Sequence, residues 1–154
     1  MGITDHLSAA DVILGLDVPT KSAVLQRLAT EAAQRLGRPE AEVLDAIESR
    51  ERLGSTALGR GVALPHARME GDAPPVVLFA RLRHAVEFEA RDEEPVDLVI
   101  LVLWPDESPE GFLPMLSDTC RSLRDAQILR RLRAAAAPEE IVALLAAPAT
   151  PGPV

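Results

Sequence analysis

The stretch from Val96 to Trp104 constrains the fold more than any other part of the chain, because it is wholly apolar after Asp97. A short continuous apolar run bounded by polar residues is typical of a β-strand that is buried on both faces. The run is also far shorter than the roughly 20 apolar residues that a membrane-spanning helix needs. We therefore expect it to form the central strand of a sheet that other layers cover on both sides.

Two helical patterns precede this strand. Apolar residues recur at helical spacing over residues 20–36, with Thr20 as the expected N-cap and Gly37 as the expected C-cap. A second helix is predicted to have Pro39 at its first position and to end near Gly54. These helices are candidates for one of the covering layers.

The remaining pattern completes an α/β chain. Strands are predicted at residues 62–64 and 76–82 and, from a weaker signal, at 12–16. Helices are predicted from about 112 to 124, after Asp125, and from Pro138 to Ala146. Helices, strands and helices in this order predict an α/β sandwich. We expect a single domain over residues 1–146 and a disordered, proline-rich tail over residues 147–154.

Composition excludes several classes of function. The net charge of −8 argues against a nucleic-acid partner, which would need a dense basic face. Cys120 is the only cysteine, so neither an intramolecular disulfide nor a Cys–Cys metal site is expected. The first twenty residues contain no Lys or Arg, unlike the basic start of a secretory leader. We expect a cytoplasmic protein with no membrane insertion.

The segment from Arg50 to His66 carries the most chemistry. His66 follows a short apolar strand and a proline, and a loop with three glycines and the hydroxyls of Ser55 and Thr56 precedes it. Such loops present backbone N–H groups that can cradle an anion, and arginine suits bidentate contact with phosphate. Neutral imidazole is a nucleophile near neutral pH, so His66 is a candidate phosphoryl acceptor.

The sequence of this segment, RERLGSTALGRGVALPH, resembles the signature of the enzyme IIA domains of the fructose/mannitol type in the phosphotransferase system. The family pattern is roughly R-E-x-x-G-S-T-x-x-G-x-G-x-A-x-P-H, and every fixed position is met between Arg50 and His66. The opening HLSAADVILGLDVPTKSAVLQRLA and the later VEFEARDEEPVDLVILVLWP are similar to other parts of the family. The nitrogen-regulatory branch is the most similar.

This resemblance implies a mixed β-sheet sandwiched between helices and the activity of a phosphohistidine carrier, a transferase of this system. His66 would accept a phosphoryl group from a phosphohistidine on an HPr-like protein, and Arg50 would support that group. Ser55 and Thr56 would belong to a phosphate-binding loop. A IIB domain or a regulatory target would be the next partner, and no metal or organic cofactor is implied.

One position departs from the family pattern. The family usually has a second histidine in an H-L-x-x-L context, and Phe112 stands at that place in Phe112-Leu113-Pro114-Met115-Leu116. Phenylalanine cannot orient the first histidine, or stabilise a phosphoryl group, by hydrogen bonding. An arginine or backbone donors would have to fill the gap.

Other interpretations stay open. The chain would instead be a regulatory module that docks on partners without being phosphorylated, or an unrelated α/β domain whose loop binds a small anion. In these cases Arg50 is a solvated charge at a helix end, and Ser55 and Thr56 only cap a turn. Arg60 and Arg68 are interpreted as solvated loop charges.

Overall fold

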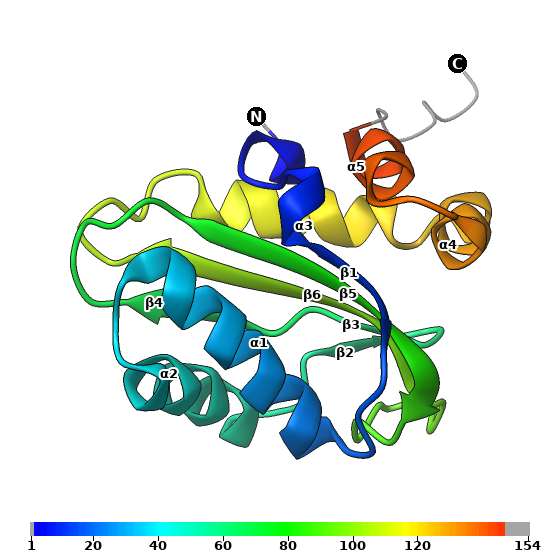
Figure 1. Cartoon of the computed structure of the whole chain (residues 1–154), viewed down its shortest axis with the longest axis horizontal. Helices are drawn as coiled ribbons and strands as arrows, with labels where there is room; N and C mark the ends of the chain where they lie inside the picture. The colour runs from blue at the N-terminus through cyan, green and yellow to red at the C-terminus, as the bar shows by residue number, and fades with distance from the viewer. Residues whose placement is uncertain (1, 147–154) are drawn as a thin grey trace.

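A computed structural model describes residues 2–146, which form a sheet between two helical layers (Figure 1). Helices α1 (Lys21–Leu36) and α2 (Glu40–Arg52) cover one face, and α3 (Phe112–Ser122), α4 (Ala126–Ala134) and α5 (Pro138–Ala146) cover the other. The predicted mixed α/β sandwich is therefore confirmed. The predicted disordered tail, residues 147–154, lies outside the described residues.

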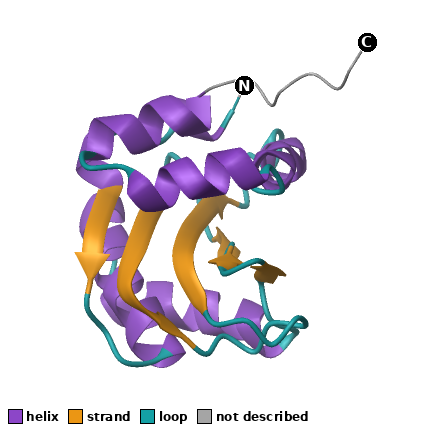
Figure 2. Ribbon diagram, turned by 90° about the vertical axis from the view of Figure 1, so that its right-hand side faces the viewer, coloured by secondary structure: helices purple, strands orange, loops and turns teal. Residues whose placement is uncertain are grey.

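The sheet has the strand order β1-β5-β6-β3-β2, and β4 pairs with β6 beyond this path. Its strands are β1 (Val12–Leu16), β2 (Ala57–Gly59), β3 (Val62–Ala63), β4 (His66–Met69), β5 (Val76–Val86) and β6 (Val96–Pro105). Strand β6 runs antiparallel to β5 and parallel to both β3 and β4, so the sheet is mixed. Figure 2 shows the strands lying between the two helical layers.

Strand β6 is central and buried on both faces, as the apolar run predicted. Val99 and Leu101 point into the core beneath α1 and α2, whereas Ile100 and Val102 point into the core on the opposite face. Each of these side chains is completely buried. The alternation follows from the two-residue period of a strand, and it makes β6 the element that both cores share.

The helix ends follow local rules. Thr20 caps α1, its hydroxyl accepting a hydrogen bond from the Ala23 N–H, and Gly37 ends the helix in the left-handed conformation with φ of 65°. Asp125 caps α4 by accepting from two backbone N–H groups. Pro39 is the N-cap of α2 rather than its first helical residue, a shift of one position from the prediction.

Two short strands replace parts of the chain that were expected to be loop. Residues Ala57–Gly59 pair antiparallel with β3, and the chain resumes at His66 as β4, directly after the predicted strand end. Arg60, between two glycines, has φ of 58° in the turn that joins β2 to β3. These strands were missed because their hydrogen-bond partners are distant in sequence and each strand has only a few residues.

Two short 3-10 helices, η1 (Ile3–Asp5) and η2 (Ala9–Asp11), lead into β1 and pack against α5. Ile3 of η1 and Leu7, which lies between the two helices, are buried in the core beneath α3 and α5. The N-terminal segment thereby helps to cover the core in which Trp104 and Phe112 are also buried.

Candidate functional site

His66 is the first residue of β4 and pairs in register with Val102 of the central strand. Its ring is half-buried, and its Nδ1 lies 2.8 Å from the carbonyl oxygen of Leu64. A carbonyl oxygen can only accept, so this contact requires the proton on Nδ1. The neutral ring therefore has its lone pair on Nε2.

The surroundings of His66 favour this neutral ring. Burial lowers the pKa of the imidazole from its ordinary value of 6.5, and the positive charge of Arg50 lowers it further. The hydrogen bond to Leu64 and the negative charge of Glu51 act in the opposite direction without reversing the shift. At neutral pH the imidazole is a nucleophile rather than a cation.

His66 opens into a cleft of about 460 Å³ formed by α2, β4 and the start of α3. The cleft is lined by Ala46, Ser49, Arg50, Leu53, His66, Ala67, Arg68 and Phe112. The structure thus brings together three of the positions singled out in the sequence: the histidine, the arginine of the R-E pair and the phenylalanine. Arg68, interpreted from sequence as a solvated loop charge, also belongs to this cleft.

Arg50 is placed beside His66 by the last turn of α2. Its Nη1 donates to the carbonyl oxygen of Gly54 at 3.0 Å, which bends the side chain back over the helix end. The guanidinium retains further N–H groups for an anion in the cleft.

Ser55 and Thr56 do not line the cleft. The Ser55 hydroxyl donates to the Phe88 carbonyl oxygen at 2.7 Å and accepts from the Ala57 N–H, and the Thr56 hydroxyl donates to the carboxylate of Glu51. The N–H groups of Thr56 and Arg60 also bond to carboxylates within the protein. These hydrogen bonds pair the polar groups of the loop with other groups of the protein. The geometry therefore gives no support to the predicted phosphate-binding role of Ser55 and Thr56, which stays a prediction.

Glu51 is the residue that sequence reasoning overlooked. Its side chain is only 6% exposed, accepts from both the N–H and the hydroxyl of Thr56, and forms an ion pair with Lys21 at 3.0 Å. Lys21 in turn lies 4.7 Å from the centre of the Phe88 ring. The carboxylate therefore anchors the glycine-rich loop to α1 and α2. The sequence signal for this role was the position of Glu51 as the second residue of the R-E pair, directly after Arg50.

Phe112 is buried at the N-terminus of α3 and meets His66 edge to face, with ring centroids 6.1 Å apart. Its other ring contact is Trp104, stacked at 5.6 Å and nearly parallel, and Trp104 meets His6 edge-on. The guanidinium of Arg68 lies 5.8 Å from the centre of the Phe112 ring. Phe112 is thus a buried apolar ring that contacts both the histidine and an arginine.

One exposed leucine lines the cleft, and a second follows the cleft residue Phe112 in sequence. Leu53, which lines it, is 84% exposed, and Leu113, next to Phe112, is 65% exposed. These two side chains place exposed apolar surface at and beside the cleft, of the kind that protein interfaces bury.

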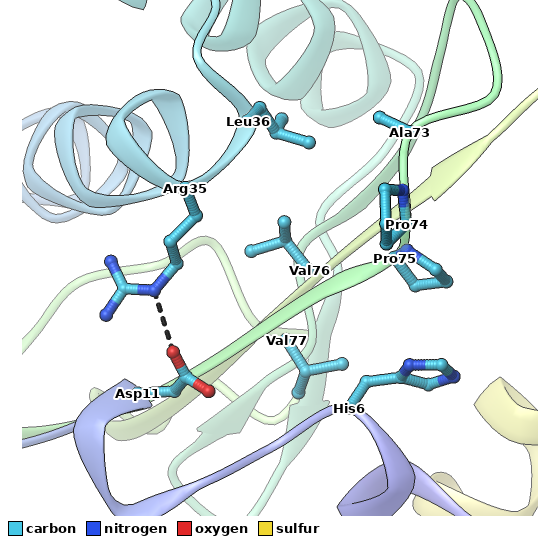
Figure 3. A pocket seen from close by; sticks show the side chains of 9 residues that line it. All are labelled: His6, Asp11, Arg35, Leu36, Ala73, Pro74, Pro75, Val76 and Val77. Carbon is cyan, nitrogen blue, oxygen red and sulfur yellow. Dashed lines mark hydrogen bonds and ion pairs between the residues drawn. The ribbon is translucent and has the colours of Figure 1, made fainter.

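A second cavity lies at the C-terminal end of α1, where Figure 3 shows the side chains that surround it. Its charged pair is Arg35 and Asp11, with Nε and Oδ1 2.7 Å apart. Nη1 of Arg35 donates to the carbonyl and the carboxylate of Glu31, and Nη2 donates to the Ala10 carbonyl. These charges join η2 to α1, so the cavity offers a ligand little that is unpaired.

The described part of the chain contains neither a cluster of metal-binding side chains nor a membrane-spanning helix. Over residues 2–146, no three His, Cys, Asp or Glu side chains come together as a metal site. Within the same range, no helix is long and apolar enough to cross a bilayer.

The fold and the cleft define an α/β protein with a nucleophilic histidine set beside cationic side chains. The chain belongs to the family described as "Phosphoenolpyruvate-dependent sugar phosphotransferase system, EIIA 2", whose model matches residues 5–147. The family predicted from the R-E to P-H motif is therefore confirmed.

The relatives come from both branches of this family. The nitrogen regulatory protein of Bradyrhizobium diazoefficiens is 39% identical over 148 residues, which cover 96% of this chain and 97% of the relative. The fructose-specific EIIA component of Haloferax volcanii is 30% identical over 152 residues, covering 95% and 97%. These similarities support a phosphocarrier or regulatory role of the phosphotransferase type.

Solved structures agree with the fold. The nitrogen regulatory protein IIA-Ntr of Neisseria meningitidis superposes with a TM-score of 0.89 at 30% identity, covering 93% of this chain and 98% of that one. IIA mannitol of Escherichia coli superposes with a TM-score of 0.73 at 25% identity, covering 91% and 99%.

Proposed function

We propose that His66 accepts a phosphoryl group on Nε2 from a phosphohistidine of an HPr-like protein. The observation that carries this proposal is the 2.8 Å contact between Nδ1 of His66 and the Leu64 carbonyl oxygen. This contact holds the proton on Nδ1 and leaves the Nε2 lone pair for attack on phosphorus. The lowered pKa of His66 keeps that lone pair unprotonated at neutral pH.

The transfer balances without an added base. The Nε2 lone pair forms the new N–P bond while the donor's N–P bond breaks, and the electron pair of the broken bond returns to the donor imidazole. A donor ring that is protonated on its other nitrogen leaves as neutral imidazole. Phosphorylated His66 keeps its Nδ1 proton and carries the positive ring charge, which the Leu64 carbonyl dipole stabilises.

Arg50 supplies positive charge for the phosphoryl oxygens in this proposal. The Gly54 carbonyl holds one of its N–H groups, so the guanidinium is positioned before a donor arrives. Phosphoryl transfer needs positioning and charge stabilisation more than covalent assistance, and a preorganised cation supplies both.

The exposed leucines favour a protein partner over a free sugar. We propose that Leu53 and Leu113 contact the donor and then the next partner, a IIB domain or a regulatory target. The nitrogen regulatory proteins among the relatives favour the regulatory target. The cytoplasm remains the proposed location.

A docking module without phosphotransfer is the second candidate, because Phe112 contributes no hydrogen bond beside His66. In this case the cleft and its leucines would bind a partner, and the state of His66 would not change. Both candidates use the same surface, so only phosphorylation separates them.

The test is phosphorylation by an HPr-like protein that its own phosphotransferase has first phosphorylated. The proposal expects an acid-labile gain of one phosphoryl group in the intact mass of the wild type, and none for His66→Ala. Arg50→Gln should slow the transfer by at least about tenfold, the loss expected for a charge-assisted hydrogen bond. An unmodified wild type, beside a control acceptor that the same donor does phosphorylate, would favour the docking module.

A further inference from the structure

The cleft of His66 holds a second cation that the proposed transfer leaves unassigned. Arg68 lies two residues beyond His66 on β4, so both side chains leave the same face of the strand, about 6.6 Å apart along it. Both line the cleft together with Arg50. A phosphoryl group on His66 would therefore lie between arginines that come from α2 and from β4.

Arg68 has donors to spare. Within residues 2–146 its guanidinium forms no hydrogen bond and no ion pair, and its side chain is exposed. The guanidinium lies over the face of the Phe112 ring, with its carbon 5.8 Å from the ring centre. A guanidinium that lies over an aromatic face keeps the N–H groups of its edge free to donate in its own plane.

Phe112 is a rigid support for this cation. It is only 4% exposed, is stacked on Trp104, and touches the ring of His66 edge-on. One buried ring thus contacts both the acceptor histidine and the guanidinium of Arg68. The arginine side chain loses part of its conformational freedom before a phosphoryl group arrives, which lowers the cost of ordering it later.

We propose that Arg68 is the second phosphoryl-binding cation of the site, and that Phe112 is the positioning residue that holds it there. This inference rests on the proposed phosphorylation of His66. Arg68 donates to the phosphoryl oxygens across from Arg50, and the dianionic group is then paired with two guanidinium ions. Phe112 stabilises the phosphorylated state through Arg68, without a hydrogen bond of its own.

The experiment uses a small donor, so that docking of a protein partner does not enter. Phosphoramidate phosphorylates histidine directly: the ring nitrogen forms the N–P bond, and ammonia leaves with the electron pair of the broken bond after protonation by water. The pH titration of the phosphoryl group is then followed by ³¹P NMR in four proteins: the wild type, Arg68→Gln, Arg68→Lys and Phe112→Leu. His66→Ala identifies the signal that belongs to His66.

Arg52→Gln is the matched control, because Arg52 is an exposed arginine near the same helix end that does not line the cleft. Loss of a paired guanidinium should make the phosphoryl group about tenfold easier to protonate, which raises its titration midpoint by about one pH unit in Arg68→Gln. Arg68→Lys should restore part of this shift. Arg52→Gln should leave the midpoint near that of the wild type.

Phe112→Leu should raise the midpoint in the same direction, and the double variant Phe112→Leu/Arg68→Gln should go no further than Arg68→Gln alone. Equal midpoints for Arg68→Gln and Arg52→Gln would overturn the role of Arg68 and leave the phosphorylation of His66 standing. A wild type that gains no signal at His66, from phosphoramidate or from the protein donor, would overturn both.

Discussion

At the scale of single residues, the proton on His66 decides the chemistry. The Leu64 carbonyl fixes that proton on Nδ1, while burial and Arg50 disfavour a second one. The two effects select one neutral tautomer, and a nucleophilic nitrogen follows without any additional general base. The sequence singled out the histidine as a candidate but left the reactive nitrogen open, because the partner of Nδ1 depends on how the backbone turns at Pro65.

The first prediction concerns the titration of His66. Because burial and the Arg50 charge both oppose the imidazolium, the pKa measured by ¹H–¹⁵N NMR should lie below 6.5. Arg50→Gln removes the positive neighbour and should move the midpoint upward, towards 6.5. A wild-type midpoint at or above 6.5 would contradict this description of the site.

Arg68 shows where single-residue reasoning stops. A charged residue shortly after the P-H pair is predicted to lie in a solvent-exposed loop, and the Arg68 side chain is indeed exposed. Its place in the cleft depends on β4 pairing with β6 and on α3 bringing Phe112 beneath it. Neither contact can be predicted from the residues next to Arg68 in the sequence.

At the scale of elements, the glycine-rich loop is held by one carboxylate. Glu51 accepts from Thr56 and pairs with Lys21, although the pattern of glycines and hydroxyls suggested that the loop serves an anion. The loop becomes the β2–β3 hairpin because these internal bonds take up its donors. Helix caps at Thr20, Gly37 and Asp125 were predictable because a cap depends on neighbours a few residues away.

The second prediction tests this anchor. Glu51→Ala leaves the Thr56 hydroxyl and Lys21 without their acceptor, so the free energy of unfolding should fall by about 1–3 kcal/mol in urea titrations. Glu48→Ala is the matched control on the same helix and should change stability by less than about 0.5 kcal/mol. Equal losses in the two variants would show that Glu51 has no special role in holding the loop.

At the scale of the whole molecule, β6 joins the two cores. Ile100 and Leu101 are neighbours in sequence and completely buried, yet they belong to cores on opposite faces of the sheet. The layered fold was predictable from this one apolar run, since only a strand covered on both sides accommodates it. The order of the strands was not, because pairing partners lie far apart along the chain.

The third prediction is that the two layers unfold together. Ile100→Ala and Leu101→Ala should each lower the free energy of unfolding by about 2–5 kcal/mol, because each leaves a cavity against the shared strand. Trp104 lies in the core beneath α3, on the face opposite Leu101. Its fluorescence should nevertheless follow the same transition as far-UV circular dichroism in Leu101→Ala. Separate midpoints for the two signals would mean that the layers are independent.

The central claim is that Nε2 of His66 carries the phosphoryl group. The most direct test is ¹⁵N NMR of histidine-labelled protein after phosphorylation by the HPr-like donor, with His66→Ala to assign the ring. We predict coupling of phosphorus to Nε2 of His66, with the Nδ1 proton retained towards the Leu64 carbonyl. Phosphorus on Nδ1, phosphorus on another histidine, or no phosphorylated ring would contradict it.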